Sequence, residues 1–261
     1  MSKKLQRANK IIDILKEKNG ATVKELALIL GVSEMTIRRD LEILKCNNII
    51  NNVYGAAIYN PSNNIEKLES FYNIENETVK HENEKIKIGR AAASLIKEDD
   101  IVIIDTGTTT EKLAEFLDND INISVLIYNT NILMALSKKK NIKLIFSGGY
   151  FHPNTMMFES PEGISLIEKT RATKVFVSAA GVHENLGVTC SNSYEVLTKQ
   201  AIIKSSLEKI LLVDSNKFGI VKSSYFAELK DFDTIITDNK ISEAWRKKIN
   251  DLGIRLIIAS L

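Results

Sequence analysis

The chain has 261 residues, of which 44% are hydrophobic and 26% are charged. These proportions are typical of globular proteins and exclude a disordered, collagen-like or disulfide-stapled chain. At roughly 150 residues per domain, the length predicts two domains. Apolar runs fall far short of the roughly 18 residues that would suggest a membrane span, and the N-terminus lacks the apolar core of a secretion signal. We therefore expect a cytoplasmic protein with no membrane partner.

The net charge of +2 conceals an uneven distribution. Residues 1–60 hold ten Lys and Arg against six Asp and Glu, whereas the remaining residues hold twenty-five against twenty-seven. A basic excess of this size suits either a solvated surface or a nucleic-acid-binding face, so the charge alone does not decide between them.

The N-terminal residues have the pattern of a helix-turn-helix. Apolar residues at steps of three and four predict a first helix, namely Leu5, Ala8, Ile12 and Leu15. Thr22 and Glu25 fit a capping box that begins a short second helix, Gly31 supplies a turn, and Ser33 suits the N-cap of a third helix to about Lys45. This order predicts a winged helix-turn-helix domain over residues 1–58, with the helix-turn-helix at about 20–39.

The third helix is the predicted reading element for DNA. Ile37, Leu41 and Leu44 should face inward, which leaves its arginines on the outer face. An arginine fork can pair with guanine or phosphate, and a Thr or Met side chain can contact a thymine methyl group. The predicted DNA-binding residues are Thr22, Ser33, Met35, Thr36, Arg38, Arg39 and, in a short β-wing, Tyr54. The alternative is a three-helix packing module with solvated arginines.

A polar, turn-rich stretch at residues 60–64 marks a linker over 59–75, and residues 76–261 form the second predicted domain. Apolar strand-like runs occur at residues 101–105, 123–128, 143–146, 175–178, 210–214, 234–237 and 255–258. Helical candidates between them cover residues 84–97, 110–118, 194–207 and 242–251. Such alternation predicts an α/β domain with a mainly parallel sheet, whose ligands bind beyond the carboxyl ends of the strands.

A loop rich in threonine follows the first of these strands and opens a helix. Its amides and hydroxyls should converge on the positive end of the helix dipole and bind an anion. The predicted effector-binding residues are Asp105, Thr106, Gly107, Thr108, Thr109 and Thr110 from this loop, with Gly148, Gly181, Lys199 and Lys217 from other strand ends and helices. The alternatives are an ordinary strand-to-helix turn and solvated lysines. Neither a Walker nor a G-x-G-x-x-G sequence is present, so nucleotide hydrolysis is not expected.

Residues 31–41 closely resemble the recognition-helix signature of DeoR-type bacterial transcription regulators. The wing departs from that family, because Asn52 and Tyr54 stand where Arg and His are common. Further matching stretches are residues 105–110, 147–149, 194–199 and 214–219. The resemblance implies an effector domain related in fold to ribose-5-phosphate isomerase and glucosamine-6-phosphate deaminase, which senses a phosphorylated sugar.

Residues 178–183 and 187–190 look most like the deoxyribonucleoside-catabolism branch of that family, which implies 2-deoxyribose 5-phosphate as the effector. The rival hypothesis is a sugar-phosphate isomerase-like or deaminase-like enzyme. The related deaminases present an Asp-Gly-His, whereas this chain has Ala180, Gly181 and Val182, so the catalytic acid is missing. Asp105, Asp214 and His183 are the polar groups that remain for such chemistry.

The sequence therefore predicts a repressor that binds double-stranded operator DNA and is released by a phosphorylated sugar. A single recognition helix covers few base pairs, so we expect a symmetric homo-oligomer. Cys46 and Cys190 fall in different predicted domains, and the three histidines lack the spacing of metal ligands. We therefore expect no disulfide, no metal site and no cofactor.

Overall fold

The computed structural model describes residues 3–18, 20–46, 50–53, 56–59, 74–78 and 80–260. Its internal contacts divide the chain into two compact units, residues 1–71 and 72–261, and each unit has a hydrophobic core of its own. Among the helices of these residues, none is both long and apolar enough to cross a membrane.

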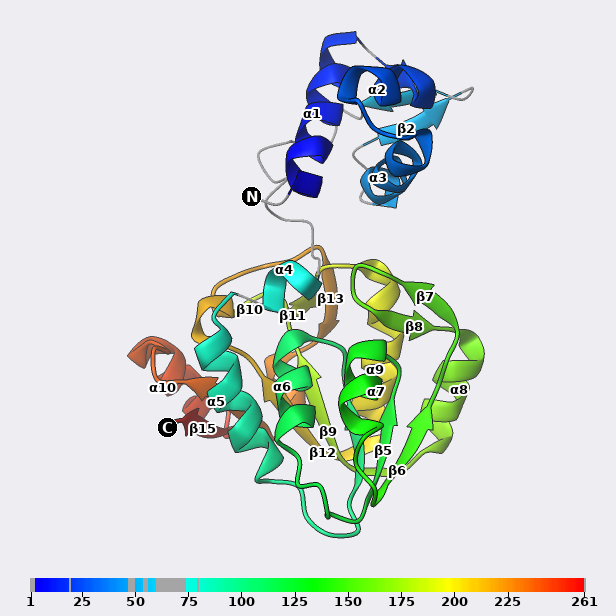
Figure 1. Ribbon diagram of the computed structural model, residues 1–261. Coiled ribbons are helices and arrows are strands. Elements are labelled where there is room, and N and C mark those ends of the chain that lie inside the picture. Colours follow the sequence, from blue (N-terminus) through cyan, green and yellow to red (C-terminus); the bar gives the residue numbers. More distant parts are fainter. Residues whose placement is uncertain are drawn as a thin grey trace. The chain divides into compact units, whose positions relative to one another are not determined.

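The N-terminal unit combines three helices with a small antiparallel sheet (Figure 1). The helices are α1 (Lys3–Lys18), α2 (Val23–Leu30) and α3 (Glu34–Cys46), and the strands, in sheet order, are β1 (Ala21–Thr22), β3 (Ala56–Tyr59) and β2 (Ile50–Val53). Ile12, Leu26 and Ile37 are fully buried between the helices. Burial of each such side chain stabilises the fold by about 1.5–3 kcal/mol.

Local signals set both ends of α2 and the start of α3. The Thr22 hydroxyl accepts a hydrogen bond from the Glu25 amide (3.3 Å), and the Glu25 carboxylate accepts one from the Thr22 amide (2.8 Å). α2 ends at Gly31, whose φ of 64° is cheap only without a side chain. Ser33 Oγ then accepts a hydrogen bond from the Thr36 amide (3.3 Å) at the start of α3. The predicted helix-turn-helix is confirmed.

The C-terminal unit is built on a seven-stranded sheet in which every pair of neighbours is parallel. In sheet order the strands are β15 (Arg255–Ala259), β14 (Thr234–Asp238), β12 (Ser206–Leu212), β9 (Ala172–Ser178), β4 (Ile101–Ile104), β5 (Ile123–Ile127) and β6 (Ile142–Phe146). All seven predicted strands are confirmed as members of this sheet. The chain winds outward in one direction from β4 and in the other from β9. Such a reversal leaves a crevice at the carboxyl ends of these two strands.

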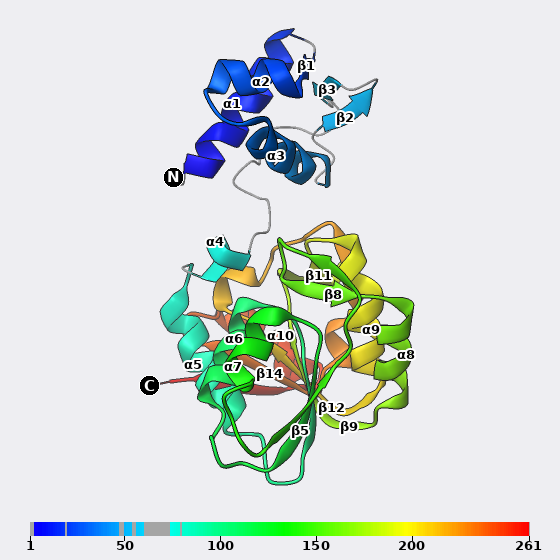
Figure 2. The same cartoon turned by 45° about the vertical axis from the view of Figure 1, so that its right-hand side comes forward.

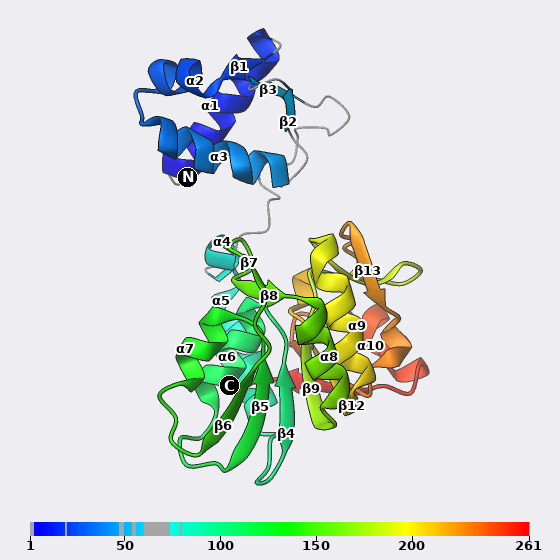
Figure 3. The ribbon, with the colours of Figure 1, turned by 90° about the vertical axis from the view of Figure 1, so that its right-hand side faces the viewer.

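Helices cover both faces of the sheet, as Figure 3 shows. α5 (Glu82–Ala93), α6 (Thr108–Phe116) and α7 (Thr130–Leu136) pack on one face, and α8 (Pro161–Lys169), α9 (Val196–Lys204) and α10 (Glu243–Asp251) on the other. Within β4, Val102 and Ile104 face the first helical layer, whereas Ile103 faces the second. A strand buried on both faces explains the unbroken apolar run in the sequence.

Smaller elements gather at one end of the sheet (Figures 1 and 2). They are α4 (Ile74–Thr78), the hairpin of β7 (Tyr150–His152) and β8 (Met157–Glu159), and an antiparallel sheet of β10 (Gly181–His183), β11 (Gly187–Cys190) and β13 (Ser224–Ala227). Short 3₁₀ turns occur at η2 (Ser193–Glu195), η3 (Ser215–Lys217) and η4 (Leu229–Asp231). The single helix expected over residues 194–207 is η2 followed by α9. It stops at Lys204 because β12 begins at Ser206.

Candidate DNA-binding and effector sites

The outer face of α3 carries the predicted DNA-binding side chains. Met35 is 63% exposed, and Arg38 and Arg39 are exposed beside the buried Ile37. Arg38 lies 3.7 Å from Glu34 of the same helix, but both side chains are at least half exposed, so the pair is weak and leaves the guanidinium free to exchange partners. This face can offer donors to base edges or phosphates.

A partly buried ion pair joins α3 to α1. Asp40 accepts hydrogen bonds from Arg7 Nε (2.5 Å) and Nη2 (3.3 Å), and its side chain is only 2% exposed. A two-bond contact between a guanidinium and a carboxylate fixes the orientation of both groups. The pair therefore holds α3 with Arg38 and Arg39 turned outward. No local sequence pattern marks Asp40 as paired, because its partner lies 33 residues away.

The other predicted DNA-binding residues lie around the start of α2 and α3. Thr22 and Ser33 are exposed N-terminal caps, and the Ser33 hydroxyl lies 2.9 Å from that of half-buried Thr36. Tyr54 lies outside the described residues, so its role stays a prediction.

Two adjacent pockets occupy the carboxyl end of the parallel sheet, and they share residues 178–180 at the end of β9. The first, here named the α4 pocket, has about 340 Å³ of empty space, part of it open solvent, and is lined by Glu77, Lys85, Lys217 and residues 107–109, 178–180 and 212–214. The second, the α9 pocket, has about 240 Å³ and is lined by Thr106, Glu195, Lys199 and residues 178–180 and 190–191. Both lie at the crevice that the strand order predicts.

The start of α6 forms one wall of the α4 pocket. Gly107 is its N-cap with φ 148°, and a Cβ there would lie 2.2 Å from Ser178 Oγ. Glycine is thus the only residue that lets this loop approach β9 so closely. Thr108 and Thr109 line the pocket, whereas the Thr110 hydroxyl donates to the Gly107 carbonyl (2.9 Å). The first amides of a helix lack intrahelical acceptors and carry partial positive charge, which favours an anion here.

Two lysines line the same pocket as this helix start. The Lys85 side chain is buried, and its ammonium donates to the backbone carbonyl of Glu77. Burial lowers the pKa of Lys85 to about 8, although the charges of Glu77 and Asp214 oppose the shift. Lys217 Nζ lies 3.3 Å from the Glu77 carboxylate. A pocket with two ammonium groups beside a helix N-terminus can bind a phosphate group.

The Glu77 carboxylate pairs with two lysines at once. Besides Lys217, it accepts a hydrogen bond from Lys80 (2.9 Å). Burial raises the pKa of Glu77, but the two lysines outweigh burial and leave the pKa below its ordinary value. Glu77 is therefore charged at neutral pH.

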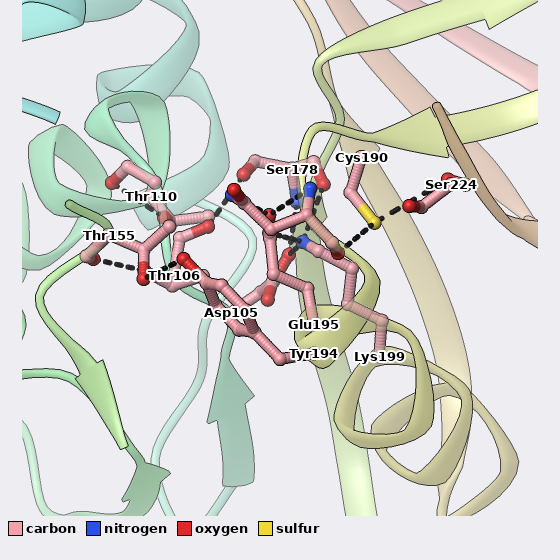
Figure 4. A network of polar contacts seen from close by, with 12 residues as sticks. Asp105, Thr106, Thr110, Thr155, Ser178, Cys190, Tyr194, Glu195, Lys199 and Ser224 are labelled. Carbon is pink, nitrogen blue, oxygen red and sulfur yellow. Dashed lines mark hydrogen bonds and ion pairs between the residues drawn. The ribbon is translucent and has the colours of Figure 1, made fainter. Parts of the chain in front are cut away.

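A buried polar network lies beneath the α9 pocket (Figure 4). Asp105 is fully buried, and its two oxygens accept hydrogen bonds from the Tyr128 hydroxyl, the Ser178 amide (2.9 Å) and Lys199 Nζ (2.5 Å). Lys199 also donates to the Ser178 carbonyl (3.0 Å) and lies 3.7 Å from Glu195. These bonds join β4, β5, β9 and α9. Because both oxygens of Asp105 already have partners, Asp105 is not arranged as a free proton acceptor.

The two pockets differ in how deeply their ion pairs are buried: Lys199 and Asp105 are 2% and 0% exposed, whereas Lys217 and Glu77 are 23% and 16% exposed. Burial lowers the pKa of Lys199, but Asp105 and Glu195 outweigh burial and raise it above its ordinary value. The ammonium is thus permanently charged and already balanced by carboxylates. An anion from solvent gains little from a lysine whose carboxylate partner is buried this deeply. The α4 pocket, with its helix N-terminus, is the better phosphate site.

The structure brings six of the ten predicted effector residues to the pockets. Gly107, Thr108, Thr109 and Lys217 line the α4 pocket, and Thr106 and Lys199 line the α9 pocket. The other four line neither: Asp105 and Thr110 are buried with protein partners, Gly148 lies between β6 and β7, and Gly181 packs closely on the Ile220 carbonyl.

Sequence reasoning missed Glu77 and Lys85. Both stand in or beside a polar stretch with weak periodicity, and a lysine in a polar run is usually solvated. The one usable signal was the helical spacing from Lys85 to the apolar Ile88 and Ala92, which are buried on the same helix.

Comparisons with known proteins agree with both units. Residues 7–63 match the DeoR-like helix-turn-helix domain, and residues 80–239 match the DeoR C terminal sensor domain. The chain is 34% identical over 254 residues to the HTH-type transcriptional regulator GolR of Listeria innocua, covering 97% of this chain and 98% of that protein. It is 30% identical over 233 residues to the deoxyribose operon repressor of Escherichia coli, covering 89% and 90%.

Among solved structures, ribose 5-phosphate isomerase A of Methanocaldococcus jannaschii is similar with a TM-score of 0.40 and 17% identity, covering 67% of each chain. A likeness this distant says nothing about activity. The sequence relatives above are named as a regulator and a repressor, not as enzymes, which supports the expectation that this chain is not an enzyme.

Proposed function

The chain belongs to the DeoR family of DNA-binding transcriptional regulators, and we propose that it represses an operon for sugar or deoxyribonucleoside catabolism and is released from its operator by a phosphorylated sugar. The observation that carries the effector half is the α4 pocket, which is lined by the N-terminus of α6 together with Lys85 and Lys217. As a regulator that binds DNA, it works in the cytoplasm.

The DNA half of the proposal assigns operator contacts to α3. Arg38 and Arg39 are exposed on its outer face, and Arg7 and Asp40 hold that face outward. Thr22, Ser33, Met35, Thr36 and Tyr54 complete the proposed DNA-binding set. One such helix reads only a few base pairs, so two or more copies of the chain bind repeated half-sites.

The effector half assigns the phosphate to the α4 pocket. Amides at the start of α6 and the ammonium groups of Lys85 and Lys217 neutralise it, and the Thr108 and Thr109 hydroxyls add donors. Asp214, which lines the same pocket, supplies an acceptor for a sugar hydroxyl.

2-Deoxyribose 5-phosphate is the first candidate. Its support is the resemblance of residues 178–183 and 187–190 to the deoxyribonucleoside branch, together with the relative named as a deoxyribose operon repressor. The relative of higher identity, GolR, does not carry that name, so other phosphorylated sugars belong in the same assay.

Fluorescence anisotropy of labelled DNA from upstream of the protein's own operon tests the proposal at stated salt, because DNA affinity depends steeply on salt. Specific binding that 2-deoxyribose 5-phosphate reverses supports both halves. Specific binding that ignores every phosphorylated pentose and hexose contradicts the effector half, and absence of sequence-specific binding contradicts the operator half.

A further inference from the structure

A carboxylate of the protein already occupies the cationic part of the α4 pocket. Glu77 Oε2 lies 3.3 Å from Lys217 Nζ, and the Glu77 backbone carbonyl accepts the Lys85 ammonium. Both lysines that we assign to the effector phosphate are therefore bonded to the same residue. With Glu77 and Asp214 present, two carboxylates balance the two lysines that line this pocket.

Glu77 belongs to an element with a special place in the chain. α4 is the first described element of the C-terminal unit, and the chain between it and β3 joins the two units. α4 is held on its own unit by the buried Ile74, whose amide donates to the Asn154 carbonyl (2.9 Å), and by the bonds of Glu77. Those bonds thus fix the position of α4 on the C-terminal unit.

We propose that Glu77 is an internal counter-ion of the effector site, and that the phosphate of the effector displaces it from Lys217 and Lys85 and so loosens α4. The inference rests on the proposed phosphate site and adds how occupancy of that site changes the protein. A phosphate brings more negative charge and more acceptor oxygens than a carboxylate, so it competes well for the same ammonium groups. Displacement of Glu77 changes how α4 is attached in the ligand-bound state. Coupling between the effector site and DNA affinity requires a structural difference of this kind.

The contrasting role for Glu77 is direct binding of the ligand. In that arrangement Glu77 remains in place and accepts hydrogen bonds from sugar hydroxyls. The two roles predict opposite effects of removing the charge: loss of a competitor strengthens ligand binding, whereas loss of an acceptor weakens it.

The test compares Glu77→Gln with wild type, with Glu84→Gln as a matched control. Glu84 pairs with Lys240 on the surface and does not line the α4 pocket. Calorimetric titration with 2-deoxyribose 5-phosphate and with inorganic phosphate measures affinity in the full-length proteins. We expect Glu77→Gln to bind both probes about two- to fivefold more tightly, the size of a partly exposed ion pair, and Glu84→Gln to match wild type.

Hydrogen exchange supplies a second readout, and its comparison of the variant with wild type needs no ligand. We expect the amides of residues 74–78 to exchange faster in Glu77→Gln than in wild type, and faster in wild type once inorganic phosphate is bound. Unchanged exchange in the variant overturns the inference. Circular dichroism of each variant shows that the fold is retained.

The outcomes separate this inference from the proposed function. Weaker binding of both probes by Glu77→Gln overturns the counter-ion role while the phosphate site stands. Tighter phosphate binding and looser α4, without any effect of sugar phosphates on DNA, supports the counter-ion and contradicts the effector proposal. Absence of phosphate binding in both wild type and Glu77→Gln overturns both.

Discussion

Replacing Lys199 with Met tests whether this lysine stabilises the fold or binds the effector. Its side chain is 2% exposed and donates to the fully buried Asp105 at 2.5 Å. Lys199→Met keeps the side-chain length but leaves Asp105 as a buried charge without its cation. Breaking a buried ion pair in this way costs about 3–5 kcal/mol, so we expect a comparable loss in the free energy of unfolding.

Urea denaturation followed by circular dichroism measures this loss at pH 7. There the pair contributes fully, because the pKa of Lys199 is raised above 10.5 and the contribution is lost only as pH rises through that raised value. Lys174→Met is the matched control: Lys174 lies 2.6 Å from Asp100, but these side chains are 13% and 10% exposed, so a smaller loss is expected. The double variant Asp105→Asn/Lys199→Met should recover part of the stability, because the buried charge of Asp105 is then removed, although buried Glu195 still lacks its cation.

A loss below about 1 kcal/mol in Lys199→Met, with no recovery in the double variant, would refute the structural role. Wild-type stability combined with lost affinity for 2-deoxyribose 5-phosphate would return Lys199 to the effector-binding set in which the sequence analysis placed it.

Three further predictions concern the two proposed sites. Arg38→Ala should weaken specific operator binding by about 1–3 kcal/mol in anisotropy titrations and leave sugar-phosphate affinity unchanged; equal DNA affinity would remove Arg38 from the reading face. Lys217→Ala should weaken binding of 2-deoxyribose 5-phosphate about tenfold, as loss of a charge-assisted hydrogen bond of about 1.5 kcal/mol predicts, while the free protein still binds DNA. Because the pKa of Lys85 is about 8, its ammonium loses its proton as pH rises through that value, so phosphate affinity should fall between pH 7 and 9. A phosphate affinity that stays constant from pH 7 to 9 in calorimetry would contradict the role of Lys85. Because the pKa of Lys85 is lowered from 10.5 to about 8 in the folded protein, the free energy of unfolding should also rise with pH between about 8 and 10.5.

The features predicted correctly are those encoded by neighbouring residues. The capping box of Thr22 and Glu25 spans three residues, and the left-handed turn at Gly31 depends on one. Strand positions followed from short apolar runs, because a strand covered on both faces needs apolar side chains throughout. Such signals are local, so they can be read from the sequence without knowledge of the segments that pack against them.

Prediction of the residues that line the two pockets was partial for the same reason. Residues 107–109 form a local strand-to-helix loop, and the structure places them on the α4 pocket as expected of such a loop. The role of Lys199 depends on Asp105, 94 residues away in sequence, and no local pattern distinguishes a paired lysine from a solvated one. The DNA-binding role of Tyr54, which lies outside the described residues, remains a prediction.

By itself, the sequence determined the two-part organisation, the helix-turn-helix and the parallel sheet, because periodicity, caps and turns act over a few residues. Only the tertiary structure decided which charges meet. Glu77 meets Lys217 across 140 residues because α4 folds back on the carboxyl end of the sheet. Burial and charge pairing depend on the assembled neighbours of a side chain, and those neighbours come from distant parts of the chain.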